Sequence, residues 1–287
     1  TWFEEKGLKL KIEDDGRIFP SSNSSMDVIA CLERTAINLG ISVITKMKVT
    51  SILLLSDNRY SLEMSNKTRI IADNVLLATG GSSSGRKIAS KLGHKIITPV
   101  PSLFSLTISD FDLNKCSGVS VSDVAVKLIT KTTTYFEVGN LLITHWGFSG
   151  PLILKISAFA ARSLNQDNYN AILRINWINK TVEQVDDEIT TFRNNQLKKM
   201  LANSRPYLKL PKRLWLELLS GLGLSAESQW ANISKLAIRK MSQRLVNSSY
   251  QIKNRGPYGE EFVTAGGVCL DEVNLKTMES KKSKGLY

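Results

Sequence analysis

Cysteine and histidine are scarce in this chain of 287 residues. Its three cysteines, Cys31, Cys116 and Cys269, lie far apart without a CxxC pair, and there are only two histidines. This composition argues against a thiolate zinc site and against a disulfide framework, and it suits a reducing cytoplasm. We therefore expect no bound metal and a cytoplasmic location.

Long apolar runs are also missing. The most apolar region, residues 141–161, is interrupted by Thr-His-Trp-Gly and Ser-Gly-Pro, so it does not read as a membrane span. No secretory leader pattern opens the chain, and its first residues resemble the middle of a protein. We expect a polypeptide shortened at both ends that makes no contact with a membrane.

Acidic residues are few in the segment from Lys198 to Arg255. This segment holds twelve Lys or Arg against Glu217 and Glu227, a net charge of +10 within a chain whose total is +12. A concentrated positive field favours a polyanionic partner, most simply nucleic acid. An ordinary basic surface explains the same count equally well, and composition leaves both interpretations open.

The stretch Asp73-Asn74-Val75-Leu76-Leu77-Ala78-Thr79-Gly80-Gly81 organises the rest of the chain. A short unbroken apolar run is typical of a strand buried on both faces, as in a parallel sheet. The two glycines at its carboxyl end permit a close approach of backbone to ligand, and ligands of open α/β sheets lie at such ends. A core strand followed by an ordinary turn is the alternative.

The segments around this stretch predict an interrupted nucleotide-binding domain. A helix after Ser24, strands at 41–44 and 49–56, and a hairpin around Asn66-Lys67 precede it, and a helix over 84–92 follows. Short alternating segments then predict an antiparallel sheet or small barrel. We predict an FAD-binding part at 1–102, a β-rich part at 103–180, a helical basic part at 181–250, and a return at 251–287.

Two further segments have the character of ligand sites. Residues 144–151, Thr-His-Trp-Gly-Phe-Ser-Gly-Pro, precede an apolar helix whose amino terminus could receive an anion; a plain capped helix is the other interpretation. The last predicted helix buries one face and carries a separate row of cations. These candidate phosphate contacts are Lys235, Arg239, Lys240 and Arg244.

Several motifs occur in an order that resembles the BaiN/YhiN-type FAD-dependent flavoproteins. They are Gly-Arg-Ile-Phe-Pro at 16–20, Leu-Leu-Ala-Thr-Gly-Gly at 76–81, Gly-His at 93–94, the 144–151 segment, Thr-Ala-Gly-Gly-Val at 264–268 and Thr-Met-Glu-Ser-Lys at 277–281. The resemblance spans the chain. It implies an α/β fold, a Rossmann-like FAD domain interrupted by a β-rich and a helical subdomain.

The resemblance also implies a set of site residues. FAD would contact Arg17, Val49, Ala78, Thr79, Gly80, Gly81, Gly266 and Gly267. The substrate would meet Thr144, Gly147, Ser149, Gly150 and Thr264, and His145 is the titratable group nearest neutrality. The family's amino-terminal diphosphate loop and its closing glycine-rich segment are absent from this sequence, so we expect weak FAD binding and an inactive fragment.

The implied reaction is reduction of a carbon–carbon double bond conjugated to a carbonyl, with FAD and either NADH or NADPH as electron donor. The family includes reductases of steroid-like bile-acid intermediates and enzymes that convert uridine in large-subunit ribosomal RNA to dihydrouridine. The basic block favours RNA as the substrate. An amine oxidase and a nucleic-acid-binding relative without redox activity are the remaining alternatives.

Overall fold

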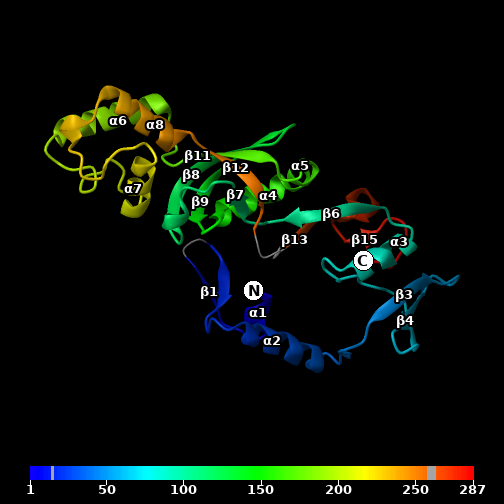
Figure 1. The fold of residues 1–287 in the computed structure, drawn as a ribbon. Coiled ribbons are helices and arrows are strands. Elements are labelled where there is room, and N and C mark those ends of the chain that lie inside the picture. The colour runs from blue at the N-terminus through cyan, green and yellow to red at the C-terminus, as the bar shows by residue number, and fades with distance from the viewer. Residues whose placement is uncertain (14–15, 257–262) are drawn as a thin grey trace. The chain divides into compact units, whose positions relative to one another are not determined.

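The computed structural model describes residues 1–13, 16–256 and 263–287. The chain divides into two compact units, one formed by Thr1–Leu76 with Lys284–Tyr287 and the other by Leu77–Ser283. We describe each unit by itself. Figure 1 shows the course of the chain through both.

The first unit combines short helices with two small antiparallel sheets. Its elements are α1 (Trp2–Glu5), β1 (Leu10–Ile12), β2 (Ile18–Pro20), α2 (Ser25–Asn38), β3 (Val49–Leu54), β4 (Tyr60–Met64) and β5 (Arg69–Ala72). β1 pairs with β2, and β3, β4 and β5 form one sheet in that order. The predicted hairpin around Asn66-Lys67 is confirmed, and Lys67 takes the left-handed conformation (φ 67°) that a tight turn needs.

Two predictions for this unit are wrong in part. The segment 41–44 forms no strand, although its apolar residues suggested one. α2 exists, but it buries Cys31 and Thr35, whereas Ile29, Leu32 and Leu39 of the apolar set remain exposed. The periodicity of a sequence identifies a helix, and it does not say what covers each face.

The organising stretch also differs from its prediction. Only Val75 makes a strand contact, a parallel bridge with Leu286, in which Val75 donates to the Gly285 carbonyl and Tyr287 donates back to Val75. The Tyr60 hydroxyl donates to the Lys284 carbonyl at 2.7 Å. The pairing of Val75 with Leu286 is parallel, as predicted for this stretch. It covers a single residue, so the paired part is much shorter than the apolar run.

The second unit is built on a closed barrel. The barrel strands are β7 (Leu106–Ile108), β8 (Ser120–Ile129), β9 (Thr134–Ile143), β10 (Gly147–Ser149), β11 (Ala171–Asn176) and β12 (Ser248–Arg255), in the spatial order β10-β7-β12-β11-β8-β9. Alternate residues of β8 and β11, including Val126, Leu128 and Leu173, point into a fully buried core. The short alternating segments predicted an antiparallel sheet or a small barrel, and the barrel is the alternative that forms.

Helices lie before and after β11 in the sequence of the barrel unit. α4 (Pro151–Phe159) and α5 (Ala161–Gln166) precede it, and α6 (Val182–Asn195), α7 (Lys212–Ser220) and α8 (Lys235–Val246) follow it; three 3-10 turns lie at Asn114–Cys116, Trp230–Asn232 and Leu270–Glu272. In Figure 1 α6, α7 and α8 gather beyond the ends of β11 and β12. The predicted combination of a β-rich part with a helical part is confirmed.

The remainder of the second unit adjoins the barrel in the sequence. α3 (Ser83–Lys91) leads to β6 (Ile96–Ser102), which pairs antiparallel with β13 (Val263–Val268), and β14 (Val273–Asn274) pairs with β15 (Glu279–Ser280). No helix in the described ranges is long and apolar enough to cross a membrane.

Candidate functional site

The glycine pair at the end of the organising stretch forms a loop that enters α3. Gly80 has a φ of +55°, and a Cβ placed on it would meet no atom within 4 Å. The Ser82 hydroxyl then caps the helix by accepting from the Ser84 amide at 3.2 Å, and Arg86 donates from Nη1 to the Gly81 carbonyl at 2.5 Å. The loop therefore presents open backbone beside a helix amino terminus, the setting in which anions bind.

A close contact between Thr79 and Gly85 fixes the shape of this loop. A Cβ on Gly85 would lie 1.8 Å from Thr79 Oγ1 and 2.8 Å from Thr79 Cβ, so the threonine side chain packs directly against the first turn of α3. Since Gly85 is a helical residue without positive φ, the requirement here is space. Thr79 and Gly85 together set the path by which the chain enters the helix.

The strand that carries the second glycine pair approaches the first pair through Thr264. β13 bulges between Ala265 and Gly267 against β6, and a Cβ on Gly266 would lie 2.7 Å from Pro99 Cα. Gly267 has a φ of +119° and open space around it. Thr264 Oγ1 lies 3.9 Å from the Cβ position of Gly81. The predicted FAD residues at 78–81 and 266–267 thus belong to one unit, and the predicted substrate residue Thr264 is a neighbour of Gly81.

A hydrogen-bonded network connects the Gly-His and Thr-Met-Glu-Ser-Lys motifs. His94, whose side chain is 3% exposed, contacts Glu272 Oε2 through Nδ1 at 3.1 Å and Ser280 Oγ through Nε2 at 2.9 Å. Lys282 Nζ lies 2.7 Å from Glu272 Oε1, and the Lys95 amide donates to Oε2 at 2.9 Å. The Lys282 ammonium first, and then the Lys95 amide, lower the Glu272 pKa to about 2.

This network was not predicted from the sequence. The available signal was that one of only two histidines belongs to a motif, and that a carboxylate and a serine follow within the last twenty residues. The network holds the segment after β13 against the start of β6. It borders the second glycine pair, because Gly267 pairs with Ile97, two residues after Lys95.

The 144–151 segment forms the hairpin from β9 into β10 and the start of α4. The Thr144 amide and hydroxyl both donate to the Gly147 carbonyl, at 2.9 and 3.1 Å, which leaves His145 exposed at the turn. β10 lies between β7 and β9, and a Cβ on Gly147 would lie 2.2 Å from the Leu106 carbonyl oxygen. Close barrel packing accounts for this glycine.

The other residues of that segment also have partners within the barrel. Ser149 Oγ lies 2.6 Å from Ser105 Oγ, and Gly150, with a φ of +89°, is the N-cap of α4. A Cβ on Gly150 would come within 2.9 Å of the Leu142 amide nitrogen. Roles of Thr144, His145, Gly147, Ser149 and Gly150 toward a substrate stay predictions.

Two predicted FAD residues belong to the first unit. The Arg17 guanidinium lies 5.4 Å from the centroid of the Phe19 ring, next to the β1–β2 hairpin, and Val49 is a half-buried residue at the start of β3. Their roles toward FAD also stay predictions.

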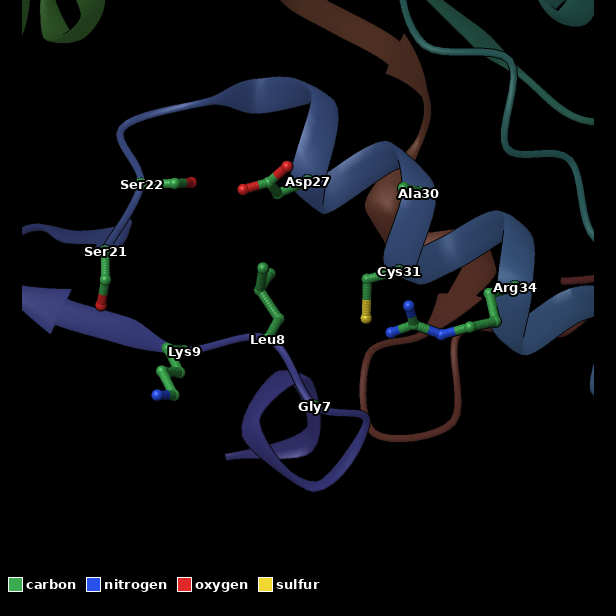
Figure 2. Close-up of a pocket in the computed structure, with 9 residues that line it drawn as sticks. All are labelled: Gly7, Leu8, Lys9, Ser21, Ser22, Asp27, Ala30, Cys31 and Arg34. Atoms are coloured by element: carbon green, nitrogen blue, oxygen red, sulfur yellow. The ribbon is translucent and has the colours of Figure 1, made fainter.

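The first unit contains a hollow of about 380 Å³ between α2 and the preceding segments. It is lined by Gly7, Leu8, Lys9, Ser21, Ser22, Asp27, Ala30, Cys31 and Arg34, which Figure 2 shows as sticks. Arg34 donates to the Lys6 carbonyl at 3.0 Å across its floor. Its polar lining is mixed in charge and does not indicate one ligand class.

Half of the predicted phosphate contacts on α8 have protein partners. Arg239 lies 3.5 Å from Glu183 on α6, and Arg244 pairs with Asp112 while its guanidinium lies 5.6 Å from the centroid of the Tyr250 ring. Lys235 and Lys240 remain exposed. The basic face of α8 is therefore weaker as an anion site than its sequence indicates, because acidic residues distant in sequence neutralise part of it.

Comparison of the sequence with known proteins identifies a family. Residues 100–263 match the model of the HI0933-like protein barrel and H2TH domain. The chain is 27% identical to a ribosomal RNA dihydrouridine synthase of Haemophilus influenzae over 99% of this chain and 70% of the relative. It is 26% identical to a 3-dehydro-bile acid delta(4,6)-reductase of Clostridium scindens over 100% of this chain and 71% of that protein.

A ribosomal RNA dihydrouridine synthase of Escherichia coli is 28% identical over 79% of this chain and 56% of its own length. The family match covers more than half of the chain and includes all six barrel strands and α6 to α8. The chain belongs to the HI0933-like family.

Proposed function

We propose that this chain is a flavin-dependent oxidoreductase that reduces uridine in large-subunit ribosomal RNA to dihydrouridine at the expense of NADH or NADPH. The observation that carries the proposal is whole-chain similarity to a relative named for that reaction. The same similarity supports a Rossmann-like FAD-binding domain around the two glycine pairs.

The residues at the glycine pairs fit a flavin cofactor. Gly80 and Gly267 leave open space where a side chain would stand, and α3 begins directly after the first pair. A flat ring or a diphosphate can therefore approach backbone amides without steric hindrance. FAD, when bound, would supply the hydride for the double bond.

The chain's own groups would bind and orient the substrate. Thr264 lies beside Gly81 and offers a hydroxyl for the uracil carbonyl at the same edge. The His94–Glu272–Ser280 network keeps the second glycine pair in place. His145 is the candidate for delivering a proton, because its imidazole ring is exposed at the β9–β10 turn and can donate or accept a proton.

An absorbance spectrum of the protein expressed from its complete reading frame and incubated with FAD tests the cofactor assignment. Retained flavin bands that NADH or NADPH bleaches are the expected result. Gly80→Ala should abolish retention, whereas Gly118→Ala is a matched control because Gly118 also has positive φ (+84°) and open surroundings. Both substitutions carry a similar backbone penalty of roughly 1–2 kcal/mol. Equal flavin retention by the two variants would contradict the site.

Ribosomal RNA from a deletion strain tests the substrate. Dihydrouridine should disappear on deletion and return with the intact gene. The whole-chain similarity to a bile-acid reductase favours a second candidate, a reductase of unsaturated steroid-like compounds. Unchanged dihydrouridine, together with flavin oxidation by a 3-dehydro bile acid, would select that candidate. Oxygen consumption without a nicotinamide cofactor would indicate an amine oxidase. A protein that retains no flavin at all would indicate a nucleic-acid-binding relative without redox activity.

A further inference from the structure

One rung of the barrel carries an aromatic side chain and two cations across three neighbouring strands. Phe136 of β9 stands opposite Lys127 of β8, and Lys127 stands opposite Arg174 of β11. Directly opposed residues of antiparallel strands point to the same face. Because Leu128 and Leu173 are buried inside, Lys127 and Arg174 face outward. Phe136 is 60% exposed.

The two cations have no acidic partner among the residues that the structure describes. Neither Lys127 nor Arg174 forms an ion pair within residues 1–13, 16–256 and 263–287, in contrast to Arg239 and Arg244 of α8. Like charges placed directly opposite on adjacent strands destabilise a sheet. Both side chains are exposed, so the pair is available to an anionic partner.

The rung opens into a hollow of about 360 Å³ where the barrel meets α6 and α8. Its lining includes Lys127, Phe136 and Arg174, with Val182 from the start of α6 and Asn247 from the end of α8. None of the residues that line it is acidic. The hollow thus combines an exposed ring, two cations and the amide side chains of three asparagines. Asp123, which accepts from the lining residue Asn179 at 3.0 Å, is itself paired with Lys209.

We propose that the Phe136–Lys127–Arg174 rung binds single-stranded RNA, with a base stacked on the Phe136 ring and the flanking phosphates held by Lys127 and Arg174. Aromatic rings next to cations on a β surface are how proteins hold unpaired nucleotides. The inference rests on the proposed function, since it takes ribosomal RNA as the substrate. It assigns the binding of the nucleotides that flank the target uridine to the barrel surface, and the reaction itself to the region of the glycine pairs.

The test is fluorescence anisotropy with a labelled oligouridine of about ten nucleotides, a length that spans such a site. The chain is used without flavin or nicotinamide, so the result does not depend on catalysis. Phe136→Ala should weaken binding roughly tenfold at an unchanged salt slope, and Phe136→Trp should retain it. Lys127→Ala with Arg174→Ala should reduce the slope of log K against log salt by about 1.4, at 0.7 per lost phosphate contact.

Lys131→Ala with Arg162→Ala is the matched control, because it removes one exposed Lys and one exposed Arg from the same unit outside the rung. The control should bind like the unaltered chain. The thermal midpoint of Lys127→Ala should be unchanged or slightly raised, which separates lost binding from lost folding.

Three results would overturn the inference: equal losses in rung and control variants, tighter binding of a duplex of the same length, or no binding of oligouridine by the unaltered chain. Flavin bleaching by NADH or NADPH is read separately. A chain that bleaches normally and shows one of these three results keeps its reductase assignment and loses this RNA surface.

Discussion

The clearest test of the barrel is the truncation Phe148→Ala. Phe148 lies in the 144–151 segment and is fully buried. Its ring centroid is 5.1 Å from that of Phe111, 4.9 Å from that of Tyr250 and 6.2 Å from that of Trp177. The substitution removes a ring from the centre of an aromatic cluster and leaves a cavity between rigid strands.

The expected loss of unfolding free energy is about 4 kcal/mol, from the range for buried Phe→Ala changes and the lost aromatic pairs. At roughly 2–4 °C per kcal/mol for a domain of this size, the thermal midpoint should fall by about 8–16 °C. Tryptophan fluorescence is a suitable probe because Trp177 belongs to the cluster.

Phe136→Ala is the matched control for this measurement. It removes the same side chain from the neighbouring strand β9, where the ring is 60% exposed, so its effect should stay within about 0.5 kcal/mol. A loss below about 1 kcal/mol in Phe148→Ala, or equal losses in both variants, would refute a barrel core centred on this segment. The 144–151 motif would then have to be explained by ligand contact alone.

Three further predictions concern single contacts. Glu272→Gln should remove an acid-sensitive part of stability. The folded-state pKa of Glu272, about 2, lies below the ordinary 4.5, so this stabilisation is present above pH 4.5 and is lost as the pH falls toward 2. Urea midpoints measured across that range should therefore change less in the variant than in the unaltered chain. Gly85→Ala should lower the thermal midpoint, and Gly85→Ala with Thr79→Ala should restore part of it, because the clash is with Thr79. A thiol reagent should label Cys269 rapidly and the two buried cysteines only on unfolding; simultaneous labelling of all three would contradict their burial.

Local patterns predicted the elements well where a single segment decides the outcome. The turn at Asn66-Lys67, the helix after the first glycine pair and the short barrel strands all follow from residue type and alternation. The strand at 41–44 failed because a short segment with three apolar residues does not form a strand without a partner to pair with.

Contacts between distant segments could not be obtained in this way. The sequence shows two glycine pairs, and only the fold places Thr264 beside Gly81. The cations of α8 were predicted as one face, and the partners of Arg239 and Arg244 come from α6 and from Asp112. The Phe136–Lys127–Arg174 rung was missed for the same reason, because strand register brings its members together and no spacing in the sequence reveals it.

The position of the helical block between β11 and β12 has a consequence for folding. These strands are neighbours, with Ile175 opposite Ser248, so about seventy residues act topologically as the loop of one hairpin. Trp177 donates through its backbone amide to the Leu245 carbonyl and through Nε1 to Ser248 Oγ, which joins the two ends of that loop. We therefore expect the barrel to close after the helices collapse, so that late pairing of β12 limits the folding rate.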